Sequence, residues 1–363
     1  MPECSAEQFP LCKNRLPDNK LQVIEFSRII AFGNGASSSD ARHALAGWPS
    51  VGHAWKMVSK GRDGRAGIDA ALVRRLIAAQ FPEWRDLPVE PVAFDGWDNR
   101  TYRLGEDMTV RLPTAAAYVP AVVKENEWIP RLAPFLPVDV PPILGMGTPG
   151  EGYGFPWSVR GWLDGIAADQ ASVEDLSAFA LAVADFLLAL QSCSTEGAPP
   201  AGAHSFYRGA SPSYYDDETR FCLKALEGRI DTAAAAEVWD AALDAECGSE
   251  ATWFHGDVAA GNLLVADGAL SAVIDFGTCG VGDAACDLVI AWTMFSGRSR
   301  AVFRDAVNKG AVGQDDGMWA RARGWALWKA LLGLVEKGGP AGVRDDERLR
   351  IVHDVVEEHR MRA

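Results

Sequence analysis

Three polar residues flank two short apolar runs in the second half of the chain. The runs are Asn262–Val265 and Leu270–Ile274, and a glycine-containing turn separates them. Apolar and β-branched arms around such a turn are typical of a β-hairpin. Asp257 comes before the first arm and Asp275 follows the second. Because a hairpin returns its far end to its near end, the sequence predicts that Asp257, Asn262 and Asp275 converge.

Two carboxylates and an amide in one place suit phosphoryl transfer. A carboxylate can orient an attacking hydroxyl and accept its proton, and Asp257 is the candidate. Carboxylate and amide oxygens are hard ligands for Mg²⁺, which makes Asn262 and Asp275 the candidate metal ligands. Protein kinases carry the same residue types in the same order. The alternative, in which Asp257 forms a turn and Asn262 a cap, does not explain the ordered occurrence of all three.

These motifs resemble a known family. The chain is similar, from about Ile68 to Glu336, to the aminoglycoside phosphotransferase family, the small-molecule branch of the kinase-like fold. The residues that carry the resemblance are His255-Gly256-Asp257, Asn262, Ile274-Asp275-Phe276, and Gly282-Asp283 followed by Asp287-Leu288. The resemblance implies a two-lobed α+β fold, with a small antiparallel β-sheet lobe containing one helix and a larger, mainly helical lobe.

The resemblance also implies a division of the chain. Residues 67–163 are expected to form the nucleotide-binding lobe, and residues 164–363 the catalytic and substrate-binding helical lobe. Residues 1–66 match nothing that can be named and are expected to be an appendage of unknown role. Their last part, Lys56–Arg65, is basic and contains glycines, which is typical of a linker.

The first lobe is expected to contain an antiparallel meander. Its strands are Val89–Phe94, Arg100–Leu104 and Met108–Leu112, and a helix over Ile68–Gln80 precedes them. A further strand is expected over Ile143–Gly147.

The turn between the first two strands contains Gly96 and Asn99. Their backbone N–H groups can cover nucleotide phosphates, as the glycine-rich loop of a kinase does. Because the turn lacks a G-x-G-x-x-G pattern, a plain hairpin turn is the alternative.

Arg111 lies near the end of the third strand. Kinases carry there a Lys that contacts the phosphates and pairs with a Glu on the next helix. Here the next helix is expected over Val119–Trp128, with Pro130 ending it. The resemblance favours Glu125 as the partner, and Glu127 is the alternative. Arg keeps the positive charge of the usual Lys, although its planar guanidinium differs from the point charge of an ammonium. The alternative interpretation is that Arg111 is a surface residue at the end of a strand.

A strand over Pro156–Leu163 leads, by resemblance, into the hinge between the lobes. Backbone groups there meet the nucleotide base in the family, which makes Val159 to Trp162 the candidates. For both Val159 and Trp162, a place in the apolar core is the alternative.

The second lobe is expected to be helical. The expected helices are 172–190 with Ser172 as its cap, 215–226, 233–247, 284–295, 299–309, 318–337 and 345–361. Between the first two lies a long loop, 195–213, which contains His204, Phe206, Tyr207 and Arg208. Loops of this length are often functional, and in the family this region helps to form the acceptor site. Asp287 resembles the family's buried Asp that braces the catalytic loop by accepting hydrogen bonds.

Composition narrows the partners. The 363 residues include 35 basic and 49 acidic side chains, a formal net charge of −14. Nothing forms a basic stripe, which disfavours nucleic acid. An acidic protein attracts cations, which suits a cationic acceptor, although acidity also serves solubility.

Seven cysteines occur without a C-x-x-C pair. This argues against a disulfide framework or a zinc site and fits a reducing cytoplasm. No run of about 18 apolar residues indicates a membrane span, and the first residues do not resemble a targeting signal.

The predicted reaction is transfer of the γ-phosphoryl group of ATP or GTP to a hydroxyl of a small molecule, with Mg²⁺ as cofactor. The resemblance points first to an aminoglycoside antibiotic, and therefore to a resistance kinase. Macrolides, choline-like alcohols and sugars are alternative acceptors. A non-catalytic nucleotide-binding module is a further alternative, supported only by Arg111 in place of Lys.

Overall fold

A computed structural model of the chain describes residues 65–93, 95–96, 98–310, 317–335 and 345–362. The chain divides into two compact units, Met1–Lys60 and Gly61–Ala363, and the second contains every described residue. The predicted appendage, residues 1–66, therefore lies outside the described residues except for its last two.

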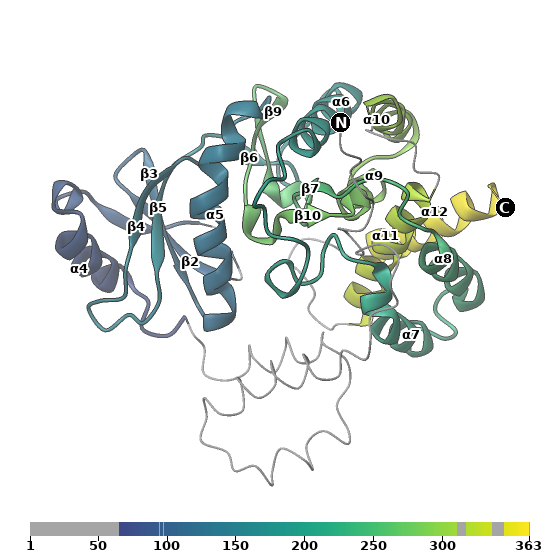
Figure 1. Cartoon of the computed structure of the whole chain (residues 1–363), viewed down its shortest axis with the longest axis horizontal. Helices are drawn as coiled ribbons and strands as arrows, with labels where there is room; N and C mark the ends of the chain where they lie inside the picture. Colours follow the sequence, from purple (N-terminus) through teal and green to yellow (C-terminus); the bar gives the residue numbers. More distant parts are fainter. Residues whose placement is uncertain (1–64, 94, 97, 311–316, 336–344, 363) are drawn as a thin grey trace, which may run out of the picture. The chain divides into compact units, whose positions relative to one another are not determined.

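An antiparallel sheet of five strands forms the first lobe (Figure 1). Its strands, in the spatial order β1-β2-β3-β5-β4, are β1 Val89–Pro91, β2 Asn99–Leu104, β3 Met108–Pro113, β5 Trp157–Gly161 and β4 Ile143–Gly147. The register pairs Leu104 with Met108 across the tight turn between β2 and β3. Tyr102, Leu104, Val110 and Leu112 are buried together in a small apolar core. The predicted meander is confirmed.

Helix α4, Ala70–Gln80, packs against this core, and Asp69 caps it by accepting a hydrogen bond from the Leu72 N–H at 2.8 Å. Helix α5, Val119–Leu132, continues past Pro130, where the sequence predicted an end. That prediction was wrong because the last turn buries apolar side chains in the larger core, and a proline there removes only one backbone donor.

The second lobe is mainly helical (Figure 1). Its α-helices among the described residues are α6 Leu176–Gln191, α7 Asp216–Ala225, α8 Thr232–Asp244, α9 Ile290–Thr293, α10 Gly297–Gly310, α11 Met318–Val335 and α12 Asp345–Arg360. Short strands complete it: β6 Ile166–Ala167 with β8 Leu263–Ala266 and β9 Ala269–Val273, and β7 Thr252–Phe254 with β10 Gly280–Gly282. None of the described helices is long and apolar enough to cross a membrane.

Two segments of the second lobe differ clearly from the sequence predictions. Helix α6 begins four residues after Ser172, because Asp175 is the cap and accepts from the N–H groups of Ser177 and Ala178, both at 2.9 Å. The segment after Asp283 is not one helix. It forms a 3₁₀ helix, Ala284–Val289, and then α9, and the Ala285 N–H donates a capping bond to Asp283 at 3.0 Å.

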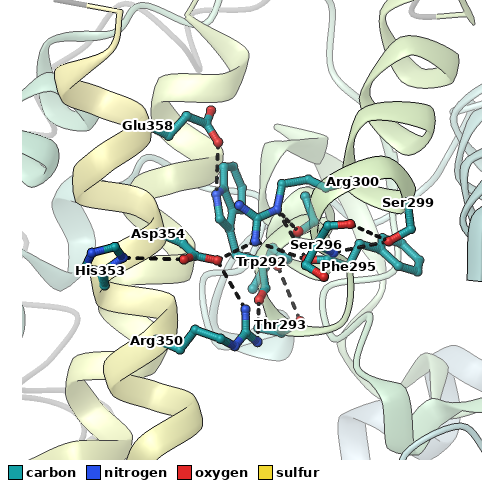
Figure 2. A network of polar contacts seen from close by, with 12 residues as sticks. Trp292, Thr293, Phe295, Ser296, Ser299, Arg300, Arg350, His353, Asp354 and Glu358 are labelled. Carbon is teal, nitrogen blue, oxygen red and sulfur yellow. Dashed lines mark hydrogen bonds and ion pairs between the residues drawn. The ribbon is translucent and has the colours of Figure 1, made fainter.

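A buried charged network joins α12 to α9 and α10 (Figure 2). Glu358 accepts from the Trp292 indole at 3.1 Å and pairs with Arg304. Asp354 pairs with Arg300 at 2.6 Å. The charge of Glu358 is therefore buried and compensated rather than solvated.

Candidate active site

The predicted hairpin is present and brings its ends together. Strands β8 and β9 pair around Asp267 and Gly268, whose φ angles of 51° and 76° are both positive, as a two-residue hairpin turn requires. At the other end the Ile274 N–H donates to the Asn262 carbonyl at 3.0 Å. Asn262 therefore lies beside the end of β9, where Asp275 follows.

Asp257 and Asn262 are in direct contact. The Asn262 amide donates to the Asp257 carbonyl at 2.9 Å and to its Oδ2 at 3.2 Å. Both donors of the amide are thus directed to Asp257, which leaves the amide oxygen for a cation.

Asp275 has a left-handed backbone, with φ of 67°, which is uncommon for a residue other than glycine. Its Oδ1 accepts from Arg111 Nη2 at 3.1 Å. Residues in such conformations cluster at functional sites, where surrounding contacts hold them. The structure therefore brings Arg111 of the sheet lobe to the hairpin of the helical lobe.

Glu125 has a closer partner than the predicted one. Arg160 bonds both of its carboxylate oxygens, at 3.0 and 2.7 Å, whereas Arg111 approaches no nearer than 3.7 Å. Burial opposes the charged form, but Arg160 and Arg111 hold the pKa of Glu125 at about 2. Glu127, the alternative, has a side chain 49% exposed. Sequence analysis missed Arg160 as a partner of Glu125. The available signal was a charged residue inside a strand that contains no other charged side chain.

Asp287 braces the catalytic loop as the resemblance implied. Its buried carboxylate accepts from the N–H groups of His255 and Gly256, each at 2.7 Å. Gly256 has a φ of 85°, and a Cβ there would lie 2.9 Å from the Thr278 carbonyl oxygen. His255 is fully buried, with Nε2 at 3.1 Å from the Ile274 carbonyl oxygen. His255 is therefore placed to support the loop rather than to meet a substrate.

The turn predicted to cover phosphates precedes β2 in the chain. Gly96 is exposed, and Asn99 begins β2 with a buried side chain. Asp98, between them, was missed by sequence analysis although it belongs to the same turn. Burial raises the pKa of Asp98 to about 7, and the nearby charge of Asp275 adds to this.

The two hinge candidates have different environments. Val159 is fully buried in the small core and pairs on both sides, with Val110 and Gly145. The core interpretation therefore holds for Val159. Trp162 is 37% exposed, its backbone N–H donates to Asp107 at 2.7 Å, and its ring lies 3.7 Å from the Arg103 guanidinium.

Lys124 joins α5 to two loops of the second lobe. Its buried ammonium donates to the Cys279 carbonyl at 2.6 Å and to the His204 carbonyl at 3.3 Å. The loop that follows Asp275 is thereby attached to the helix that carries Glu125. Burial lowers the pKa of Lys124.

A pocket lies beside Asp257. Its empty space measures about 260 Å³, open solvent included, and its lining includes Arg208, Asp257, Trp325, Trp328 and Lys329. Both tryptophans are buried. The loop with Arg208 was expected to help form the acceptor site, whereas Lys329 had no sequence signal because it lies 72 residues from Asp257.

Lys329 sets the charge of Asp257. Its Nζ lies 3.0 Å from Asp257 Oδ1. Burial favours the protonated carboxyl, but Lys329 first and Arg208 next lower the pKa of Asp257 to about 2. Asp257 is thus a carboxylate throughout the neutral range.

Comparisons with known proteins agree with this geometry. The model of the phosphotransferase enzyme family matches residues 89–325, more than half of the chain. The chain belongs to the phosphotransferase enzyme family. No match was found among curated proteins.

Solved structures of family enzymes share the fold. The GDP and kanamycin complex of APH(2")-IIia is 18% identical, with a TM-score of 0.56 over 80% of this chain and 98% of that one. The macrolide 2'-phosphotransferase MphH from Brachybacterium faecium is 20% identical, with a TM-score of 0.52 over 78% and 97%. The two-lobed, kinase-like α+β fold implied by the resemblance is confirmed.

Removing Arg160 should destabilise the protein. In Arg160→Met, Glu125 stays buried and keeps only the 3.7 Å contact with Arg111, so we expect a loss of about 3–5 kcal/mol in the free energy of unfolding. Urea titration measures it. The control is the double variant Arg160→Met/Glu125→Gln, which removes the uncompensated charge and should recover part of the loss.

The same pair should make stability depend on pH. Because the folded-state pKa of Glu125 is about 2, below its ordinary 4.5, its contribution is present above pH 4.5 and is lost as the pH falls towards 2. The stability difference between parent and Arg160→Met should therefore narrow over this window. A difference that stays constant with pH would contradict the assignment.

Replacing Lys329 should raise the pKa of Asp257. In Lys329→Met, burial is no longer opposed by the adjacent ammonium, so we expect a rise of about one unit or more. The carboxyl ¹³C shift of Asp257, followed during acid titration, measures it. Lys329→Arg keeps the charge and is the matched control. Equal titration curves for the parent and Lys329→Met would refute the ion pair.

Proposed function

We propose that this chain transfers the γ-phosphoryl group of ATP or GTP to a hydroxyl of a small molecule. The observation that carries the proposal comes from the open end of the hairpin. There Asn262, before the first strand, contacts Asp257, and Asp275, after the second strand, contacts Arg111. This is the set of groups that phosphoryl transfer needs: a base, oxygen ligands for a metal, and a cation for the phosphates.

Asp257 is proposed as the base that orients the acceptor hydroxyl and accepts its proton. Its low pKa keeps it ionised, and its contacts with Asn262 and Lys329 fix the carboxylate in place. Catalysis of this kind comes chiefly from positioning and charge stabilisation rather than from covalent chemistry.

Asn262 and Asp275 are proposed to hold Mg²⁺. The Asn262 amide oxygen and the second oxygen of Asp275 are hard donors, and Mg²⁺ is usually held by one or two protein carboxylates together with substrate phosphates and water. The residues therefore fit the ion. When bound, it would neutralise charge on the phosphates.

The nucleotide is proposed to lie between the sheet lobe and the hairpin. Arg111, positioned by Glu125, would contact its phosphates, and the turn from Gly96 to Asn99 would cover them. Relatives of similar fold have been crystallised with GDP. Val159 has no free strand edge, and the Trp162 N–H already donates to the Asp107 carbonyl. Of the hinge candidates, Trp162 is therefore proposed to meet the base with its exposed ring or its backbone carbonyl.

The acceptor is the finer part of the proposal. Relatives include an enzyme crystallised with kanamycin and a macrolide 2'-phosphotransferase, and an aminoglycoside acceptor would make this chain a resistance kinase of the cytoplasm. A non-catalytic role is disfavoured, because Asn262 contacts Asp257 and Arg111 reaches Asp275 although it replaces the usual Lys.

Asp257→Asn should abolish turnover. The substitution keeps the shape of the side chain but removes the base, so nucleotide affinity should stay within about tenfold, or 1.4 kcal/mol. Phosphate incorporation into a panel of aminoglycosides, macrolides and amino alcohols is the measurement for both proteins. Full activity in Asp257→Asn, or no incorporation by the parent into any acceptor class, would contradict the proposal.

Asp275→Ala should remove the Mg²⁺ dependence of nucleotide binding. The variant loses one of the two proposed ligands and also releases Arg111. Nucleotide affinity with Mg²⁺ and with a chelator, compared by calorimetry, measures the effect. If Mg²⁺ still strengthens binding as much as in the parent, the metal is held elsewhere.

A further inference from the structure

We propose that the pocket beside Asp257 takes an acceptor that carries an anionic group, in the simplest case a carboxylate, close to its hydroxyl, and that Arg208 binds this group. The inference rests on the proposed function, because it names the acceptor class for the same site.

The charge of the pocket points to an anion. Its charged lining residues are Asp257, Lys329 and Arg208. Lys329 compensates Asp257 at 3.0 Å, whereas no carboxylate in the described part of the chain forms an ion pair with Arg208. The nearby Asp287 is already occupied by two backbone N–H groups. Arg208 therefore has no described carboxylate in ion-pair contact with it, although its charge also acts on Asp257.

Aromatic rings hold the Arg208 guanidinium. Its carbon lies 4.4 Å from the Trp328 ring centre, and the rings of Tyr215 and Trp325 lie at 5.7 and 5.9 Å. Its one hydrogen bond among the described residues is a long contact of 3.4 Å to the Tyr215 hydroxyl. A guanidinium has five N–H donors, and stacking leaves its edge able to bind a carboxylate bidentately.

The backbone around Arg208 is held in an uncommon conformation. Phe206 and Tyr207, the two residues before it, both have left-handed backbones, with φ of 49° and 56°. Ser205 Oγ donates to the Arg208 carbonyl at 3.0 Å, and the Tyr215 hydroxyl donates to the Phe206 carbonyl at 2.6 Å. Two consecutive strained residues, held by buried or partly buried bonds, indicate a position fixed for function.

A polycation fits this pocket poorly. Its amino groups would meet Arg208 and Lys329, and like charges in contact are repulsive at partly buried sites. The pocket is small, and Arg208, Trp328 and Lys329 are among the side chains that line it. The pocket therefore receives one compact end of the acceptor, and that end meets positive charge and aromatic walls.

A matched series of benzyl alcohols tests the inference. 4-(Hydroxymethyl)benzoate, 4-(hydroxymethyl)benzamide and 4-(hydroxymethyl)benzylamine share one ring and one hydroxyl and differ in charge. Dissociation constants for the full chain are measured by NMR titration. We expect the benzoate to bind at least about tenfold more tightly than the amine, with the amide between them.

Variants assign the effect to Arg208. Arg208→Met should remove the advantage of the benzoate and leave the amide within about twofold, and Arg208→Lys should keep part of the advantage. Arg85→Met, at a side chain 63% exposed on the sheet lobe, lowers the net charge equally and should change nothing. If Arg208→Met does not fold, a salt titration of the parent protein takes its place. Raising the ionic strength from about 0.05 to 0.5 M should then reduce the advantage of the benzoate over the amine.

Several outcomes overturn the inference. These are tighter or equal binding of the amine, no binding of the benzoate, an advantage that survives in Arg208→Met, and equal weakening of all three compounds in Arg208→Met, which would assign Arg208 to the shape of the pocket and not to an anionic group. Failure of the proposed function is a separate result, since binding of the benzoate without phosphate incorporation into any acceptor removes the kinase activity and keeps the anion site. Phosphorylation of kanamycin with no benzoate binding would keep the kinase activity and remove the anion site.

Discussion

The lobes of this enzyme are joined by a line of alternating charges, Arg160, Glu125, Arg111 and Asp275. Glu125 and Arg160 are each 1% exposed, and a carboxylate buried so deeply needs full compensation. Arg160 supplies it with two hydrogen bonds. Arg160 therefore supplies the closer compensation of Glu125, and Arg111 is able to bind Asp275. The substitution of Arg for the usual Lys is consistent with this division, because the structural task and the proposed phosphate-binding task fall to two different cations.

The loop that carries Asp257 is fixed by backbone bonds rather than by apolar packing alone. Asp287 accepts both N–H groups that precede Asp257, and Lys124 attaches the segment after Asp275 to α5. A left-handed residue such as Asp275 costs about 1–2 kcal/mol, which these contacts must offset. Such rigidity suits a reaction in which positioned charges supply most of the rate.

Local patterns predicted the parts of the site that lie close together in sequence. The Asp267-Gly268 turn and its apolar arms determine the hairpin, and the hairpin determines where Asn262 and Asp275 lie. The missed residues act over long sequence separations: Arg160 lies 35 residues from Glu125, and Lys329 lies 72 from Asp257. No periodicity encodes such contacts, which arise only when helices and strands pack.

The net charge of the chain and the charges that line the pocket favour different acceptors, and this difference also arises from contacts that form only when the chain packs. A net charge of −14 favours a cationic acceptor only while the acceptor is distant, and at physiological salt that field is screened beyond about 8 Å. Within the pocket, preference is set by the groups in contact, and there Lys329 pairs with Asp257 while no described carboxylate forms an ion pair with Arg208. Overall charge thus influences the rate of encounter, whereas one arginine on an aromatic wall determines which end of an acceptor can settle beside the base.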